Sequence, residues 1–432
     1  MKASSLLGGS CVIVLAALGV HAACNSASAA PQTAEAPKEP APDPNALGPK
    51  DESLAPLLRT SPLLSPLLDK ASTLRLQVLV SAVREPAPGA VPPVATLIRS
   101  GYRVDAEYFY PASSIKLAAA VGALEKLGTL RKNGGEGASV DAPLRFFAGS
   151  GMSPQERDGS NLDGGRITLG HEVKKALIVS NNDAFNRLLD FAGYDELAGR
   201  MAGDGFSSVR IRHYLGAAPS LAGDARQNPR IQIVAAEGQP PIEIEARQST
   251  RALGASDVPG LTVGSAYLDD KGQKVDGPMD FSQKNRISLR DLQDMLIGVV
   301  RPDLLADRKT ALDEPERVFL TAVLGTPPSA SKNPSFDAES QPDSLHRPLL
   351  VAVRKAMPGH RIRSYEKNGQ AYAFVVQNTY LVDETTHRSV FVSAAAYVNG
   401  NGTMNLDQYR YDDVTQPLFD GLADVIARQF LN

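Results

Sequence analysis

The stretch 110-YPASSIKLAAAVGALEKLGTL-130 places two serines and a lysine at the start of a long apolar run. Ser113 and Lys116 are three residues apart, so on a helix their side chains share a face. A serine hydroxyl is a poor nucleophile until a base removes its proton, and a desolvated lysine beside a second cation can be that base near neutral pH. We therefore expect a helix from about Ser113 that carries a nucleophile and its base. The simpler alternative is a lysine whose ammonium reaches solvent from a packed helix.

Two further short motifs lie in contexts that suit the same site. Ser180-Asn181-Asn182 interrupts a helical pattern that opens at the candidate N-cap Thr168, and a second helix is expected over residues 183–191. These polar residues prefer caps and turns, which places the motif on a loop between two helices. Lys367-Asn368-Gly369 leads directly into a β-rich segment. Helix caps and an edge-strand lysine are the plainer interpretations, and only the ordered set of motifs supports a shared site.

Strand patterns occur early and late in the chain, with helical patterns between them. Strands are expected at residues 74–83, within 95–110, and at 371–376, 379–382 and 387–400; helices are expected at 54–74, 288–300, 314–323 and 413–431. This order predicts a sheet built from both ends of the chain, with a helical lobe inserted between the two sets of strands. A cleft is expected where the lobe meets the edge of the sheet.

The ordered motifs SSIK, SNN and KNG resemble the Ser-x-x-Lys, Ser-Asp-Asn and Lys-Thr-Gly set of the serine β-lactamase and penicillin-binding protein superfamily. The chain looks most like the class A β-lactamase-related serine hydrolases, from about residue 74 to the C-terminus. The resemblance implies an α+β fold with three α/β/α layers: an antiparallel sheet from both chain ends and an all-helical lobe at about residues 111–325. It implies an exported enzyme that is acylated by a β-lactam or a related amide or ester, and no cofactor or metal.

The resemblance also assigns the catalytic roles by motif position. Ser113 would be the acylated nucleophile, and Lys116 would accept its proton. Ser180 would pass a proton to the leaving nitrogen.

The substrate-binding roles follow from the same comparison. Asn182 would hold Lys116 and contact the substrate amide, and Lys367 would attract the substrate carboxylate. Asn368 stands where the family has a carboxylate-binding hydroxyl, and Gly369 would leave room for the substrate. The backbone N–H of Gln370 would join that of Ser113 in an oxyanion hole.

Three departures from the family pattern bear on the activity. Asn181 replaces the middle Asp of the second motif, and Asn368 replaces the Thr or Ser of the third. Class A β-lactamases also carry a Glu-x-x-Leu-Asn segment whose Glu activates the deacylating water. The region between Ser180 and Lys367 has none; it contains Glu196, Glu237, Glu243 and Glu245, each without that context. The alternatives are therefore a D-alanyl-D-alanine peptidase-like or esterase-like hydrolase with little β-lactamase turnover, or a non-catalytic binding lipoprotein.

The N-terminus is typical of an export signal. Residues 1–23 contain a short apolar run that ends in Ala22-Ala23, followed by Cys24. A cysteine there resembles the lipidated first residue of a bacterial lipoprotein, whereas cleavage by an ordinary signal peptidase is the alternative. Residues 24–50 are rich in Ala and Pro and predict a flexible tether. The hydrolase domain is expected over residues 51–432, held at the cell envelope or in the periplasm by a lipid anchor in the membrane.

Composition limits the partners. The 45 basic and 48 acidic residues give a net charge of −3, which gives no reason to expect nucleic acid. We expect a small-molecule or peptidoglycan-like substrate and a protein that acts as a monomer.

Overall fold

The computed structural model describes residues 51–91, 94–148, 155–162, 164–216, 226–234, 238–254, 258–305, 308–406, 409 and 411–432. The expected export signal, the tether and Cys24 lie outside these residues. Among the described helices, none has the length and apolar character needed to cross a membrane.

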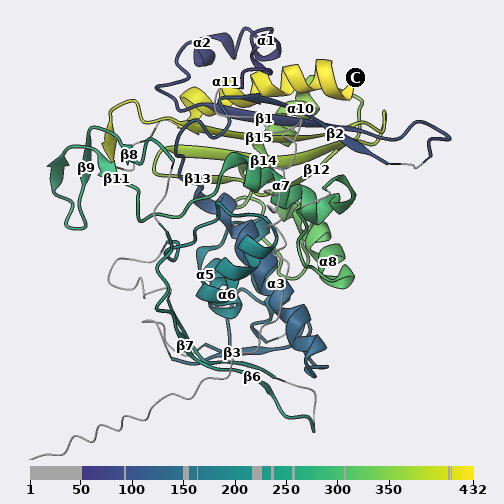
Figure 1. The fold of residues 1–432 in the computed structure, drawn as a ribbon, viewed down its shortest axis with the longest axis vertical. Helices are drawn as coiled ribbons and strands as arrows, with labels where there is room; N and C mark the ends of the chain where they lie inside the picture. The colour runs from purple at the N-terminus through teal and green to yellow at the C-terminus, as the bar shows by residue number, and fades with distance from the viewer. Residues whose placement is uncertain are drawn as a thin grey trace, which may run out of the picture. The chain divides into compact units, whose positions relative to one another are not determined.

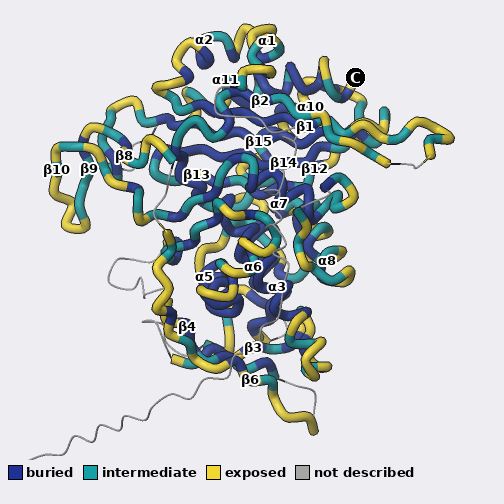
Figure 2. The backbone as a smooth tube through the Cα atoms, in the orientation of Figure 1, coloured by how far each residue is buried: buried dark blue, intermediate teal, exposed yellow. Residues whose placement is uncertain are grey.

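One antiparallel sheet joins the two ends of the domain, as the sequence predicts. Its strands are β1 (Gln77–Arg84), β2 (Thr96–Tyr102), β12 (Ile362–Glu366), β13 (Gly369–Ala371), β14 (Phe374–Asp383) and β15 (Ser389–Tyr397). The order is β12-β14-β15-β1-β2, and β13 continues the edge beside β14. The register pairs Val80 with Val392 and Val392 with Thr379. Strands β14 and β15 are buried along almost their whole length, because helices cover both faces of the sheet (Figure 2).

The helices form the outer layers and the lobe. They are α1 (Ala55–Leu58), α2 (Ser65–Leu68), α3 (Lys116–Lys132), α4 (Leu169–Ile178), α5 (Asn182–Ala192), α6 (Tyr194–Gly203), α7 (Leu289–Val300), α8 (Glu314–Gly325), α9 (Asp343–His346), α10 (Pro348–Ala356) and α11 (Tyr411–Ile426). Helix α11 packs against α1 and α10 on one side of the sheet, while α7 packs on β1, β14 and β15 from the other side (Figure 1). The expected three-layer α+β architecture is confirmed.

Helix α3 is the centre of the lobe and is surrounded by α4, α5, α6, α7 and α8. Every residue from Lys116 to Gly128 is buried, so the helix has no solvent-facing stripe over three turns. The apolar run in the sequence predicts such a core helix. Its consequence for the site is that any charge at its N-terminal end is removed from water.

The expectation of an all-helical lobe was wrong in one respect, because the inserted segment also contains short strands. These are β3 (Leu144–Phe146), β4 (Gln227–Asn228), β5 (Ile231–Ile233), β6 (Ile242–Ile244), β7 (Arg247–Gln248), β8 (Thr262–Val263), β9 (Ala266–Leu268), β10 (Lys274–Asp276) and β11 (Met279–Asp280), with β16 (Thr403–Met404) pairing β9. In β5 and β6 isoleucines alternate with polar residues, a period of two that favours a half-buried strand over a helix. Helices α6 and α10 were also absent from the sequence-based expectation.

Candidate active site

The turn before helix α3 presents Ser113 to a cavity. The 3-10 turn Ala112–Ile115 leads directly into α3, and Ala112 has a φ of +48°, a conformation that residues with a Cβ rarely adopt. Ser114 is buried, and its hydroxyl donates to the carbonyl of Pro111 at 2.6 Å. Ser113 is half-buried and lines the cavity. The turn therefore selects Ser113, not its neighbour, as the candidate nucleophile.

Lys116 is the first residue of α3 and is 0% exposed. Its Nζ donates to the carbonyl oxygen of Ser180, to Asn182 Oδ1 at 2.7 Å and to Ser180 Oγ at 3.2 Å. Burial, and to a smaller extent the charge of Lys367, lowers the pKa of Lys116 to about 6. The amine is therefore largely neutral at neutral pH, which is the state that a general base needs.

The loop between α4 and α5 aims Ser180 at Lys116. Thr168 caps α4 by accepting from the backbone N of His171 at 3.1 Å, and Asn181 caps α5 by accepting from the backbone N of Ala184 at 2.8 Å. Ser180 lies between the two helices with a φ of +61°. The predicted loop between two capped helices is confirmed, and the Asn that replaces the family's Asp is a helix cap.

Lys367 lies at the junction of the edge strands β12 and β13. Its backbone N donates to the carbonyl of Asn378 at 3.1 Å, so pairing with β14 continues through the motif. The residue is 4% exposed. Burial lowers the pKa of Lys367 to about 7, although the adjacent charge of Glu366 acts to raise it. The second ammonium of the site is therefore also close to neutrality.

Gly369 lets strand β13 pack directly on the nucleophile turn. A Cβ at this position would lie 2.6 Å from the carbonyl oxygen of Pro111 and 2.7 Å from the backbone N of Ser113 and of Ser114. Such contacts are shorter than van der Waals packing allows. The glycine therefore makes room for the turn that carries Ser113, a reason that the sequence did not supply, while room for the substrate stays a prediction.

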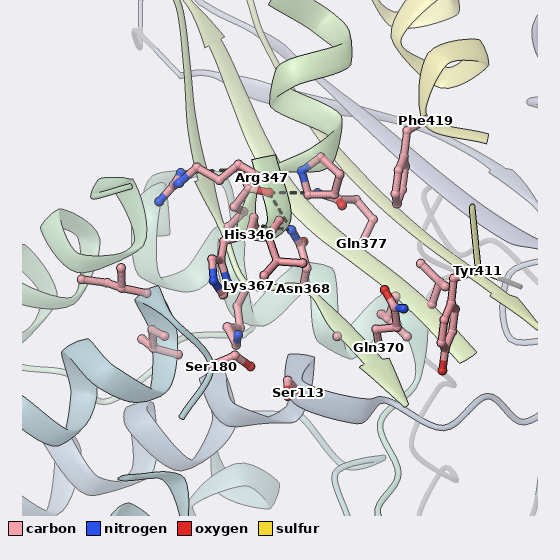
Figure 3. A pocket seen from close by; sticks show the side chains of 18 residues that line it. Ser113, Ser180, His346, Arg347, Lys367, Asn368, Gln370, Gln377, Tyr411 and Phe419 are labelled. Atoms are coloured by element: carbon pink, nitrogen blue, oxygen red, sulfur yellow. Dashed lines mark hydrogen bonds and ion pairs between the residues drawn. The ribbon is translucent and has the colours of Figure 1, made fainter. Parts of the chain in front are cut away.

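One cavity of about 350 Å³ collects these groups. Ser113, Ser180, Lys367 and Gln370 lie on its wall (Figure 3), as does Gly369. The hydrogen bonds of Lys116 connect that lysine and Asn182 to the same wall through Ser180. The rest of the wall is formed by Leu177, Ile178, Leu345, His346, Arg347, Pro348, Glu366, Asn368, Val375, Val376, Gln377, Tyr411 and Phe419. Residues that are distant in the sequence thus meet where the lobe joins the sheet edge.

Asn368 does not direct its amide toward a ligand, in contrast to the sequence-based expectation. Its Nδ2 donates to the carbonyl of His346 at 2.9 Å and to Glu366 Oε2 at 2.8 Å, and its Oδ1 accepts from the backbone N of Asn378 at 3.2 Å. The amide is shaped to bridge these partners, which a hydroxyl is too short to do. Asn368 therefore ties the end of α9 to the edge strand.

Sequence reasoning missed a buried ion pair beside Lys367. Glu366 and Arg347 are 4% and 5% exposed, and Arg347 Nη1 is 3.5 Å from Glu366 Oε1. The carboxylate of Glu366 also accepts hydrogen bonds from Ser364, Asn368, Gln377 and Thr379. The sequence did contain a signal, because the pattern IRSYE places the charged Glu366 in a strand. A charge buried in a core strand needs a partner.

The acidic residues considered from the sequence lie elsewhere. Glu196 pairs with Lys126 and Arg247, each at 2.7 Å, and Glu243 contacts Arg230 at 3.5 Å on β6. Glu245 is exposed. Glu237 lies outside the described residues. Among the described residues that line the cavity, the one carboxylate is that of Glu366.

Comparisons with known proteins give one family match and several solved structures of similar fold. Residues 99–312 match the family model described as the beta-lactamase enzyme family. Solved structures with a similar fold include β-lactamases from Desulfarculus baarsii (15% identity, TM-score 0.46, 87% of this chain and 96% of that chain), Burkholderia vietnamiensis (12%, 0.45, 85% and 96%) and Xanthomonas campestris (14%, 0.44, 87% and 96%). No curated protein matches the chain. The family match over residues 99–312, and three motifs that meet on one cavity in the expected order, support the serine β-lactamase and penicillin-binding protein superfamily as the family of this chain.

Proposed function

We propose that the protein is an exported serine hydrolase of the class A β-lactamase type that forms an acyl-enzyme at Ser113. The observation that carries this proposal is the buried amine of Lys116, bonded to Ser180 at the wall that also holds Ser113 and Lys367. A buried lysine is costly to a fold. Its pKa near 6 matches the requirement of a base that works at neutral pH.

The proposed reaction gives each of these groups the role that the family resemblance implies. Lys116 Nζ accepts the proton of Ser113 as its Oγ attacks the carbonyl carbon of the substrate. The C–N or C–O bond of the substrate breaks, and Ser180 Oγ donates a proton to the leaving atom and regains one from the Lys116 ammonium. The backbone N–H groups of Ser113 and Gln370 hold the oxyanion, because β13 packs directly on the nucleophile turn at Gly369.

The substrate class follows from the charge and the size of the cavity. Arg347 and, when it is protonated, Lys367 place positive charge on the wall of a space of about 350 Å³, and the carboxylate of Glu366 is already bonded to its neighbours. A compact amide or ester with a carboxylate near the scissile bond, such as a β-lactam or a peptidoglycan-like peptide, fits these features. Asn182 would contact its amide and Lys367 its carboxylate.

A second function is favoured by one observation on deacylation. Glu366 is the one carboxylate on the described cavity wall, and Arg347, Ser364 and Asn368 already bond it. It is therefore not free to activate water. A D-alanyl-D-alanine peptidase-like or esterase-like hydrolase with slow release of a β-lactam acyl group is consistent with this wall.

The location belongs to the same proposal. Residues 1–23 would direct export, Cys24 would carry a lipid, and residues 24–50 would hold the catalytic domain away from the membrane. Radiolabelled palmitate incorporation that is lost on Cys24→Ser would support the anchor, and unchanged incorporation would refute it.

Labelling with a fluorescent penicillin tests the nucleophile. We expect the wild-type protein and Ser114→Ala to be labelled and Ser113→Ala to remain unlabelled, because Ser113 lines the cavity whereas the hydroxyl of its neighbour Ser114 is bonded to Pro111. Labelling of the Ser113→Ala protein would refute the proposal. Nitrocefin kinetics then separate the two functions: a burst without turnover supports the slow hydrolase, and sustained turnover supports the β-lactamase.

A further inference from the structure

His346 lies on the cavity wall, where the family's third motif would supply a hydroxyl that this chain lacks. The family's third motif supplies a hydroxyl to the substrate carboxylate, but here the position is Asn368, whose amide bonds His346 O, Glu366 and Asn378. The carbonyl that receives the Asn368 amide belongs to His346 itself. The substitution therefore removes one donor from the cavity and fixes the backbone of a residue whose imidazole lines it (Figure 3).

The imidazole is oriented by Gln341. His346 Nε2 lies 2.8 Å from Gln341 Oε1, and since an amide oxygen only accepts, Nε2 carries the proton in this contact. Among the described residues, none forms a hydrogen bond with the other ring nitrogen, Nδ1, so this nitrogen is the candidate contact for a ligand. Protonation of Nδ1 would turn it from an acceptor into a charged donor.

The charges around His346 decide when that protonation occurs. Lys367 at the strand junction, Arg347 next in the chain and Lys116 on α3 all oppose a positive imidazole, whereas Asp343 on α9 favours it. The Asp343 carboxylate is itself bonded to the backbone N and the hydroxyl of Ser329, at 3.0 and 2.7 Å. Burial, then Lys367 and Arg347, lowers the pKa of His346 to about 4, so the imidazole of the empty cavity is neutral at neutral pH.

A carboxylate in the cavity would shift this balance toward the protonated imidazole. Its negative charge offsets the repulsion from Lys367 and Arg347 and so raises the pKa of His346. The proton comes from solvent, and no bond of the ligand changes. Binding and protonation are then linked, so each favours the other.

We propose that His346 is a specificity-determining residue of this site: its imidazole takes over the role of the missing hydroxyl, takes up one proton as the substrate binds, and donates from Nδ1 to the substrate carboxylate. This inference rests on the proposed function for the identity of the substrate. It assigns to the chain a carboxylate contact that its third motif no longer supplies.

Binding measured without acylation tests the proposal. Two proteins are compared, the Ser113→Ala variant and the same variant that also carries His346→Ala. Calorimetry at about pH 7 measures how tightly each binds benzylpenicillin and its methyl ester. We expect the acid to bind about 10-fold or more weakly to the His346→Ala protein, the loss of one charge-assisted hydrogen bond, and the ester to change by less than about 2-fold. Titrations in two buffers of different ionisation enthalpy should show greater proton uptake with His346 present.

Two further variants serve as controls for the loss of the His346 side chain. His346→Asn, a polar side chain without a titrating ring, replaces His346→Ala if the latter fails to fold, and His387→Asn on the exposed turn after β14 should bind the acid as the parent does. Equal weakening of acid and ester, or equal proton uptake with and without His346, would overturn the proposal. If the wild type is never acylated yet the acid–ester difference holds, the proposed function fails and the role of His346 stands.

Discussion

Lys116 is the residue at which the chemistry and the stability of the protein conflict. It lies at 0% exposure at the start of a helix that is buried over three turns. Because the pKa of Lys116 is lowered from an ordinary value near 10.5 to about 6, the unfolded chain binds more protons than the folded protein between these values. Folding stability therefore increases as pH rises through this range and falls as pH drops toward 6.

Lys116→Met should stabilise the protein while it abolishes acylation. The thioether fills a similar volume without a buried ammonium, so we expect the free energy of unfolding at neutral pH to rise by about 1–3 kcal/mol. Urea unfolding measures the change, and penicillin labelling measures the loss of activity. An unfolding free energy that falls by a similar amount would show that the bonds to Ser180 and Asn182 outweigh the cost of burial.

The two lysines also set a narrow pH profile for acylation. The base works when Lys116 is neutral, above about pH 6, and carboxylate binding works when Lys367 is charged, below about pH 7. We expect the second-order acylation rate of a penicillin to rise through the first value and fall through the second, with both values belonging to the coupled pair. Stopped-flow acylation across the range measures the profile. A rate that still increases well above pH 8 would contradict a charged Lys367 as the carboxylate partner.

At the scale of elements, the site depends on how closely strand β13 packs on the turn that precedes α3. Motif patterns place Ser113, Ser180 and Lys367 on a helix start, a loop and a strand because cap residues and apolar periodicity are local signals. The contact at Gly369 is not local. It depends on two segments that are distant in the sequence, and for this reason the sequence did not indicate it.

Gly369→Ala should slow acylation, although the added methyl group carries no reactive or charged atom. The new Cβ would meet backbone atoms of Pro111 and Ser113 at 2.6 and 2.7 Å, so strand and turn must separate. We expect a loss of about 1–3 kcal/mol in stability and about 100-fold in acylation rate. Gly199→Ala is the control, because a Cβ in α6 meets nothing within 4 Å and alanine favours the helix. Equal effects of the two substitutions would show that β13 tolerates the extra atom.

At the scale of the whole molecule, the pair Arg347–Glu366 joins the lobe to the sheet. Arg347 Nη2 donates to the carbonyls of Leu324 and Thr326, both at 2.8 Å, at the end of α8. Its Nη1 reaches Ser364 on β12 at 2.7 Å. The guanidinium thus fixes the position of α8 relative to the edge strand that carries Lys367.

Arg347→Ala should destabilise the fold strongly, because it leaves the buried Glu366 carboxylate without its cation. We expect a loss of about 3–5 kcal/mol in urea unfolding. Arg317→Ala, which removes an ion pair with the exposed Glu314 on the surface of α8, should cost no more than about 1 kcal/mol. A loss at Arg347 as small as that at Arg317 would contradict a structural role for the buried pair.

The sequence could predict the sheet from both chain ends, the cap Thr168, the loop at residues 180–182 between two helices, and the convergence of the three motifs. Each depends on a short pattern with one physical meaning. The sequence could not predict the short strands of the lobe, the bridging hydrogen bonds of Asn368 or the ion pair beside Lys367. They depend on which distant segment packs against which, and a lone Glu or Asn in a strand pattern does not name its partner.

Time-resolved intact-mass spectrometry with benzylpenicillin tests the central claim most directly. We expect one added mass of intact penicillin on the wild-type protein, mapped to the peptide that contains Ser113, the serine of the turn that lines the cavity. The Ser113→Ala protein should gain no mass. An adduct of equal extent on that variant, or an adduct mapped to another residue, would contradict an acyl-enzyme built by Ser113, Lys116, Ser180 and Lys367.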